Sequence, residues 1–110
     1  MQREYDVIVT IVNRGLADKI VKASKDAGAE GGTILHGRGT GIREQKSFLG
    51  LTIDPEKEIV LTIITSDLTD NVLDAIVTAG DLNKPGTGIC FVMGLKHVKG
   101  IVHHQTAMPK

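Results

Sequence analysis

The sequence has 110 residues, of which 13 are Lys or Arg and 13 are Asp or Glu, so its formal net charge is zero. Aromatic residues make up 3% of the chain and tryptophan is absent, which leaves neither the positive charge nor the stacking surfaces of a nucleic-acid-binding protein. Because 41% of this short chain is apolar, we expect one domain, residues 1–110, around one core.

The amino-terminal residues and the single cysteine indicate the cellular compartment of the protein. Residues 1–6 are charged and lead directly into a strand, so we expect no secretory signal, no membrane insertion and a cytoplasmic protein. Cys90 lies in an apolar run, which is typical of a small core residue. We therefore expect neither a disulfide nor a thiolate metal site.

The first half of the chain predicts a strand, a helix and a second strand. Residues 6–13 are β-branched almost throughout, as in a central strand. An amphipathic helix follows over residues 16–27, with small or apolar residues at helical spacing. Residues 33–36 predict a short strand, whereas residues 38–50 hold too much glycine and charge for another strand and are interpreted as an exposed functional loop.

The second half repeats this order. Residues 58–65 predict a strand, and a helix capped by Asp67 follows, with a buried stripe formed by Leu68, Val72, Leu73, Ile76 and Val77. The last strand covers residues 89–93, where Gly94 interrupts it. The order β-α-β-β-α-β predicts an α+β, ferredoxin-like fold with an antiparallel sheet. Since the strands are apolar at both alternating sets of positions, we expect the face without helices to pack against other subunits.

Two glycine-rich turns, residues 31–41 and 80–88, lie beside predicted strand ends. Backbone N–H groups can close around an anion where glycine removes the Cβ, and Arg38 and Lys84 add one cation to each turn. The turns therefore predict a site for a phosphate-bearing small molecule. In the alternative, the glycines serve only a bulge and a turn, and both cations are solvated.

Three segments, residues 31–41, 55–60 and 85–89, carry a resemblance to a known family. Together with the order of the elements, they resemble the PII signal-transduction proteins, in particular a PII-like branch with a shortened T-loop. The resemblance runs from Tyr5 to about Val102 and implies a homotrimer. It places the T-loop at residues 39–56, the B-loop at residues 80–88 and a tail at residues 103–110, which has little to bury and suits disorder.

In this family ATP or ADP lies between subunits, and magnesium can accompany the nucleotide. Carried over by position, the nucleotide-binding residues are Thr33, Gly39, Gly41, Lys57, Gly86, Thr87 and Gly88, with Arg38 and Lys84 as further cations. The hydroxyl of Thr87, which stands at a commonly acidic position, is expected to reach a phosphate oxygen.

The chain also departs from the family pattern. Ile89, Gly100 and Val102 stand where the family has phosphate-binding cations, so we expect ATP binding to weaken more than ADP binding. Arg38, Lys84, Lys99 and His103 are candidate substitutes for the missing cations. The short T-loop lacks the family's glutamine and its uridylylated tyrosine, so neither 2-oxoglutarate binding nor uridylylation is expected.

The resemblance implies a protein that signals energy or nitrogen state to a transporter or metabolic enzyme. The partner-docking loop would use Arg43, Lys46, Phe48 and Leu49; a hairpin packed back on the core is the alternative for this segment. Two other functions stay open: a sensor of another small anion, such as bicarbonate or a cyclic nucleotide, and a trimeric structural adaptor without a ligand.

No residue set predicts catalysis or metal binding. The serines and Cys90 lack a neighbouring base and orienting group, so we expect a binding protein and not an enzyme. His103 and His104 are adjacent and would point to opposite faces of a strand, which does not suit a metal site. His36 is interpreted as a strand histidine with a partner, and Glu56 and Glu58 as solvated or capping carboxylates.

Overall fold

The computed structural model describes residues 4–39, 46–48, 51–53 and 55–101. The elements follow in the order β1 (Tyr5–Asn13), α1 (Ala17–Asp26), β2 (Thr33–Arg38), β3 (Lys46–Phe48), β4 (Leu51–Ile53), β5 (Glu56–Thr65), α2 (Thr69–Gly80) and β6 (Gly88–Leu95). A 3-10 turn, Ser66–Leu68, precedes α2. The predicted α+β, ferredoxin-like fold is confirmed.

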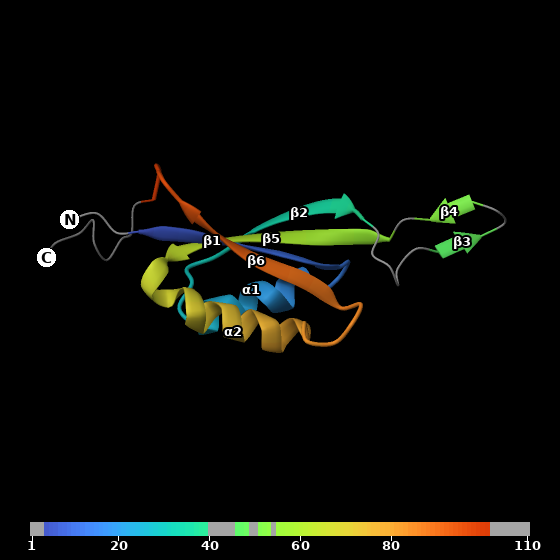
Figure 1. The fold of residues 1–110 in the computed structure, drawn as a ribbon, viewed down its shortest axis with the longest axis horizontal. Helices are drawn as coiled ribbons and strands as arrows, with labels where there is room; N and C mark the ends of the chain where they lie inside the picture. Colours follow the sequence, from blue (N-terminus) through green and yellow to red (C-terminus); the bar gives the residue numbers. More distant parts are fainter. Residues whose placement is uncertain (1–3, 40–45, 49–50, 54, 102–110) are drawn as a thin grey trace, which may run out of the picture.

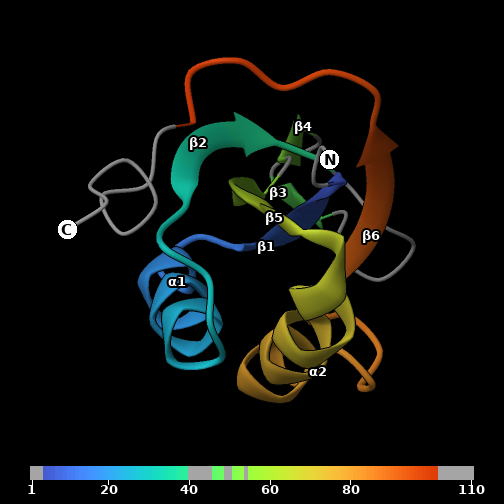
Figure 2. The ribbon, with the colours of Figure 1, turned by 90° about the vertical axis from the view of Figure 1, so that its left-hand side faces the viewer.

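Four of the strands form one antiparallel sheet in the order β2-β5-β1-β6. The central strands β5 and β1 are rich in β-branched residues, while β2 and β6 form the edges. Both helices lie against the same face of this sheet, and the other face carries no helix (Figure 2). The fold therefore has two layers, and only one face of the sheet is covered by helices.

The core fills the space between the sheet and the helices. Alternate residues of a strand point to one face, so the even-numbered residues of β1 and β5 meet the helices. The residues of this core are at most 6% exposed. Each large apolar side chain buried in this way contributes roughly 1.5–3 kcal/mol; among them are Ile8, Val12, Ile20, Val60, Ile64, Val72 and Ile76. The stripe predicted for α1 is confirmed, since Ile20 and Ser24 are fully buried.

Two threonine side chains interrupt the apolar core. Thr10 of β1 and Thr62 of β5 are fully buried, and neither hydroxyl has a hydrogen-bond partner among the residues that the structure describes. An unsatisfied buried hydroxyl costs roughly 1–3 kcal/mol. These positions therefore lower the stability that the core would otherwise have.

The uncovered face of the sheet is also apolar. Exposed apolar side chains on this face come from three strands, with Leu35 47%, Ile63 45%, Ile89 56%, Phe91 41% and Met93 49% exposed. Residues 96–101 leave the end of β6 and cross above one end of this face to the edge formed by β2 (Figure 2). The expectation of an open apolar face is thus met within one copy of the chain.

Several local predictions need correction. Residues 46–53 include the strands β3 and β4, which pair with each other, so the segment interpreted as a loop contains a hairpin. This hairpin lies beyond the end of the four-stranded sheet and not back on the core (Figure 1). Gly94 does not end the last strand, because its backbone still pairs with Asp6 in β1. Asp67 lies inside the 3-10 turn, and the N-cap of α2 is Leu68, which makes no side-chain cap hydrogen bond.

Candidate functional site

One end of the sheet gathers most of the predicted site. Here β1 and β2 end and β5 and β6 begin, and the turn between α2 and β6 lies at the same end as the connection from β2 to β5 (Figure 1). Across the sheet, Gly88 lies opposite Val12, Val12 opposite Glu58, and Glu58 opposite His36. The B-loop equivalent and the base of the T-loop equivalent therefore occupy opposite edges of the same end.

A shallow pocket of about 480 Å³ lies on the β2 side of this end and is lined by Arg14, His36, Gly37, Arg38, Glu56 and Lys57. The Arg14 guanidinium is 2.7 Å from the Glu56 carboxylate, and both side chains are exposed. An exposed ion pair of this kind contributes at most about 1 kcal/mol to stability. The pocket thus brings several charged groups together, of which Arg14, His36, Arg38 and Glu56 are exposed, and we call it the loop-base pocket.

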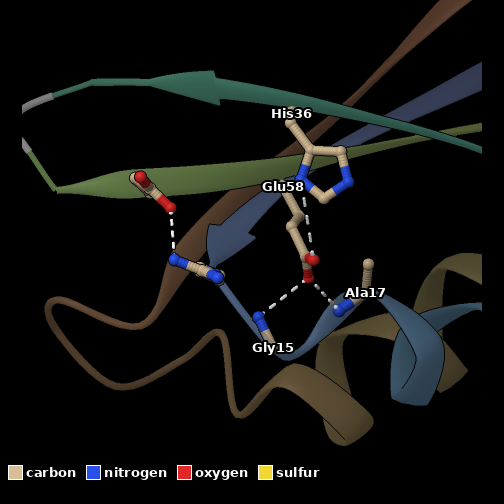
Figure 3. Close-up of polar contacts among 6 residues, drawn as sticks. Gly15, Ala17, His36 and Glu58 are labelled. Carbon is tan, nitrogen blue, oxygen red and sulfur yellow. Dashed lines mark hydrogen bonds and ion pairs between the residues drawn. The ribbon is translucent and has the colours of Figure 1, made fainter.

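Glu58 joins this pocket to the start of α1. One oxygen of its carboxylate accepts hydrogen bonds from the backbone N–H groups of Gly15 and Ala17, each at 2.9 Å (Figure 3). The N-cap residue Leu16 has no capping side chain, so a residue of β5 satisfies the first N–H groups of the helix. The interpretation of Glu58 as a capping carboxylate is confirmed.

These contacts set the charge of Glu58. The hydrogen bond from Ala17 lowers the pKa of the carboxyl, and the bond from Gly15 and the nearby His36 act in the same direction against the effect of desolvation. The second oxygen of Glu58 is 3.9 Å from Nδ1 of His36 (Figure 3). This separation is too long for a hydrogen bond and allows an ion pair only with a protonated ring, so a satisfied partner for His36 stays a prediction.

Lys57 points away from the other cations. Its ammonium group donates a 2.7 Å hydrogen bond to the side-chain oxygen of Asn13, and Lys57 is 7% exposed. Lys57 and Asn13 lie at positions of β5 and β1 that face the uncovered side of the sheet, whereas Arg38 and Glu56 lie at positions facing the helices. Arg38 and Lys57 therefore flank the same end of the sheet on opposite faces.

The B-loop equivalent owes its glycines to geometry. Gly86 has a φ of +82°, a conformation that other residues rarely adopt, although a Cβ there would meet no atom within 4 Å. Gly88 has a φ of +153°, and a Cβ would lie 2.6 Å from the carbonyl oxygen of Ile11. The reading of the glycines as turn residues is therefore sufficient to explain both positions.

Polar side chains of this turn bond within it. The Thr87 hydroxyl lies 2.8 Å from the carbonyl oxygen of Asp81 and 2.9 Å from that of Lys84, so its hydrogen is donated inside the turn. The Lys84 ammonium lies 3.5 Å from the Asp81 carboxylate and stays exposed. The expected role of the Thr87 hydroxyl at a phosphate would thus require it to give up these bonds, whereas Lys84 can reorient.

Thr33 belongs to a second pocket at the other end of β2. This apolar pocket of about 470 Å³ is lined by Tyr5, Gly28, Ala29, Glu30, Gly31, Gly32, Thr33, Leu61, Ile63, Ile64, Thr65, Leu68 and Ile101. Thr33 pairs with Leu61, which pairs with Val9, so Thr33 lies three residues, or about 10 Å along a strand, from the level of Val12 and Gly88. The strands β5 and β1 also separate β2 from β6, so one chain does not bring Thr33 into contact with Gly88.

The remaining predicted residues are described only in part. Gly41, Arg43, Leu49 and His103 lie outside the described residues, and Lys46 and Phe48 are described only as backbone of β3. Lys99 is exposed on the segment that follows β6. Sequence reasoning missed Arg14 as a site residue, because only the pairing of β1 with β5 brings it to Glu56.

Neither a reactive thiol nor a metal-binding cluster is found among the described residues. Cys90 is half-buried, and burial raises the pKa of its thiol, as in an unreactive core cysteine. Within residues 4–39 and the other described segments, His, Cys, Asp and Glu side chains form no group of three or more that could hold a metal ion. In the same segments, no helix has the length and apolar character to cross a membrane.

Comparison with known families identifies the family of this chain. The model of the family described as nitrogen regulatory protein P-II matches residues 5–105. The chain belongs to the P-II family. Proteins of this family are signalling regulators and not enzymes, and the resemblance proposed from residues 31–41, 55–60 and 85–89 is confirmed at the level of the family.

Solved structures support the same fold. A crystal structure of a Bacillus cereus protein related to NIF3 is similar, with a TM-score of 0.65 and 26% sequence identity over 86% of this chain. The match covers 26% of that protein, so the chain spans about a quarter of its length. No curated protein matches the chain significantly.

Proposed function

We propose that this PII-like signalling protein binds ATP or ADP between copies of the chain. It reports the energy or nitrogen state of the cell to a partner protein, a transporter or a metabolic enzyme, through the loop formed by residues 39–56. The membership of the P-II family supports the signalling role. The nucleotide and the site rest on the geometry described above.

The observation that carries this proposal is the separation of two complementary half-sites on one chain. Arg38 and the turn that contains Gly86 and Gly88 lie at one end of the sheet, where donors and cations suit phosphates. The apolar pocket at Thr33 lies at the other end and suits a purine base. Thr33 and Arg38 lie at the two ends of β2, five residues or about 17 Å apart along the strand, and β5 and β1 separate Thr33 from Gly88. Each nucleotide would therefore use the phosphate half of one copy and the base half of the next.

The base half has a suitable size and lining. Its volume of about 470 Å³ falls within the range of roughly 300–1,000 Å³ that is usual for small-molecule pockets. Leu61 and Ile63 supply apolar walls, while the backbone of Gly31 and Gly32 and the hydroxyl of Thr33 supply hydrogen-bonding groups. This combination fits a flat base with polar edges.

The uncovered face of the sheet would join the copies. It exposes Ile63, Ile89 and Phe91 by 41–56% each, and such a surface is stable in water when another subunit covers it. A closed ring of copies places the same surface of each chain against its neighbour. We therefore propose the homotrimer that the family resemblance implies.

The signal would start where the loop begins. The backbone N–H of Gly39 donates a 3.2 Å hydrogen bond to the carbonyl oxygen of Pro55, so the two ends of the loop are held together beside Arg38. A phosphate bound there would favour one arrangement of these ends over another. The hairpin of β3 and β4 projects from this base, and a two-stranded hairpin of this kind is only marginally stable alone, which suits a segment that a partner stabilises (Figure 1).

Calorimetric titration with ATP and ADP tests this proposal, with and without magnesium and 2-oxoglutarate, together with the mass of the protein in solution. We expect both nucleotides to bind a trimer with micromolar affinity. ADP should bind more tightly than ATP, because the missing cations weaken the binding of the triphosphate more. 2-Oxoglutarate should have no effect on either affinity. Absence of binding of both nucleotides to the trimer would overturn the proposal, and the same titration with bicarbonate and cyclic nucleotides would then identify another anion.

A matched pair of lysine variants locates the phosphates. Lys84→Ala removes an exposed lysine that lies 3.5 Å from Asp81, and Lys22→Ala removes an exposed lysine of α1 that lies 3.0 Å from Asp26. Only Lys84 lies in the B-loop equivalent. We expect Lys84→Ala to weaken ADP binding about tenfold and Lys22→Ala to leave it unchanged, because one charge-assisted contact is lost in the first case alone.

A further inference from the structure

The loop-base pocket holds several charged groups and one histidine. Arg14, Arg38 and Lys57 line it, while the carboxylates of Glu56 and Glu58 lie at the same end of the sheet. Three positive charges thus stand against two negative ones, and the ammonium of Lys57 bonds to Asn13 on the opposite face of the sheet. His36 also lines the pocket, and its side chain is 73% exposed. Protonation of its imidazole therefore adds one positive charge to the cluster.

We propose that protonation of His36 converts the loop-base pocket into a binding site for a doubly charged oxyanion, such as a phosphate group of the nucleotide. The inference rests on the proposed function in one respect: the phosphates must bind at this end of the sheet. It adds a regulation that the nucleotide site would not otherwise have, namely a response to pH.

The contacts of Glu58 make His36 suitable for this role. One carboxylate oxygen of Glu58 is held by the N–H groups at the start of α1, so the other oxygen keeps a fixed place 3.9 Å from Nδ1 of His36. The His36 ring and the Glu58 carboxylate therefore lie close together at this end of the sheet (Figure 3). Imidazole is also the ordinary side chain that changes charge between about pH 5 and 8.

The other charged groups near His36 supply a constant background. Lys57 lines the pocket from β5, but its ammonium bonds to Asn13 on the opposite face of the sheet. Asp18 lies in the first turn of α1, the helix whose start Glu58 caps. Lysine, arginine and carboxylate side chains ordinarily keep their charge between about pH 5.5 and 8, so a pH response in this range isolates the histidine.

The position of His36 also connects the switch to the loop. His36 lies in β2, three residues before Gly39. The N–H of Gly39 donates a hydrogen bond to the carbonyl oxygen of Pro55, at the other end of the loop. An anion drawn in by protonated His36 would lie beside Arg38, immediately before this hydrogen bond. Protons and the nucleotide would thereby act on the same end of the loop.

Sulfate is the probe for the experiment, because its two negative charges do not change between about pH 5.5 and 8 whereas those of a nucleotide do. Sulfate is titrated into the protein at about pH 5.5 and again at about pH 8. The backbone amide NMR signals of Gly37 and Gly39 report its binding at each pH. We expect binding about threefold to tenfold tighter at the lower pH, as one added charge near a dianion at a partly solvated site would give. His36→Gln should bind sulfate with the same affinity at both pH values.

His97→Gln is the matched control. His97 is an exposed histidine on the segment after β6, and it does not line the loop-base pocket. This variant should keep the full pH response of the unmodified protein. A pH response that survives in His36→Gln, or disappears in His97→Gln, would overturn the inference, as would an affinity that does not change with pH.

The inference and the proposed function fail separately. ADP binding at constant pH tests the nucleotide site alone, and loss of that binding with an intact sulfate response would leave a proton-dependent anion pocket without a nucleotide. Normal ADP binding with a flat sulfate response would retain the nucleotide site and remove the switch.

Discussion

The two faces of the central sheet are built from nearly the same residue types and meet opposite surroundings. On the helix-covered face Ile8, Val12 and Val60 are completely buried. On the uncovered face Ile63, Ile89 and Met93 are 45–56% exposed, although they alternate with the buried residues along the same strands or the strands beside them. A strand that is apolar on both sides therefore indicates two buried faces, and one chain supplies the cover for only one.

This difference separates two kinds of stability. The helix-covered face stabilises each copy of the chain, because its burial is complete within that copy. The uncovered face can contribute only when copies associate, so its contribution depends on protein concentration. The predictions below separate these two contributions, beginning with the largest expected effect.

An isoleucine on each face provides the first test. Ile8→Ala empties part of a core in which Ile8 is completely buried and should lower the free energy of unfolding by about 2–5 kcal/mol. Ile63→Ala changes a residue that is 45% exposed and should cost about 1 kcal/mol or less in the dissociated chain. Urea denaturation at several protein concentrations measures both, and equal losses at the lowest concentration would contradict the comparison.

A charge on the uncovered face should prevent assembly and spare the fold. Phe91→Glu places a carboxylate on the exposed apolar face, between Ile89 and Met93 of the edge strand β6, where covering it by another copy would leave a buried, unpaired charge. We expect sedimentation to show single copies and circular dichroism to show unchanged secondary structure. A trimer that persists in this variant would place the interface elsewhere.

The two B-loop glycines should differ in cost. Gly88→Ala brings a Cβ to 2.6 Å from the carbonyl oxygen of Ile11 and should lower the free energy of unfolding by about 2–3 kcal/mol. Gly86→Ala has a similarly unfavourable φ but open space around the Cβ, so about 1 kcal/mol is expected. Thermal unfolding measures the stability of both variants. A larger loss of stability for Gly86→Ala would show that the close approach to Ile11 does not set the cost at Gly88.

The buried hydroxyls offer a stabilising change. Thr62→Val replaces a buried hydroxyl that has no partner among the described residues by a methyl group of similar size, and it should raise the free energy of unfolding by about 1 kcal/mol. Thr33→Val, at an exposed position of the uncovered face, serves as the control and should change stability by less than about 0.5 kcal/mol. Destabilisation by Thr62→Val would mean that its hydroxyl is satisfied in solution.

Acid should loosen the start of α1 through Glu58. Since the folded protein lowers the pKa of this carboxyl, the contribution of Glu58 to stability is complete above its ordinary value of 4.5 and is lost as the pH falls through the lower folded value. Glu58→Gln should therefore flatten the decrease of stability with acid in this range, measured by urea denaturation as a function of pH. Glu56→Gln, which changes only an exposed ion pair, should keep the decrease seen in the unmodified protein.

Much of the fold could be predicted from local patterns. The β-branched residues of β1 and β5 and the helical spacing of apolar residues in α1 predicted the elements to within a few residues. The hairpin of β3 and β4 was predicted only as an alternative, and as packed on the core, because glycine and charge near residues 38–50 concealed two short strands. Gly94 was interpreted as a break, yet pairing with β1 holds it in the strand.

The candidate site was harder to predict because its parts are distant in the chain. Arg38, Lys57 and the turn around Gly88 were chosen from glycine, charge and family resemblance, and they do lie at one end of the sheet. The face on which each side chain lies depends on strand register, which put Lys57 and Arg38 on opposite faces of the sheet. The contact of Glu58 with the start of α1 spans more than 40 residues of the chain.

The sequence by itself determined the elements, their order and the family, since these follow from periodicity, glycine positions and residue types along the chain. Only the tertiary structure decided which apolar face is covered, that His36 lies beside Glu58, and that the apolar pocket at Thr33 and the loop-base pocket lie toward opposite ends of β2. The physical reason is that strand pairing and helix packing bring together residues far apart in sequence, and no local pattern encodes those distances.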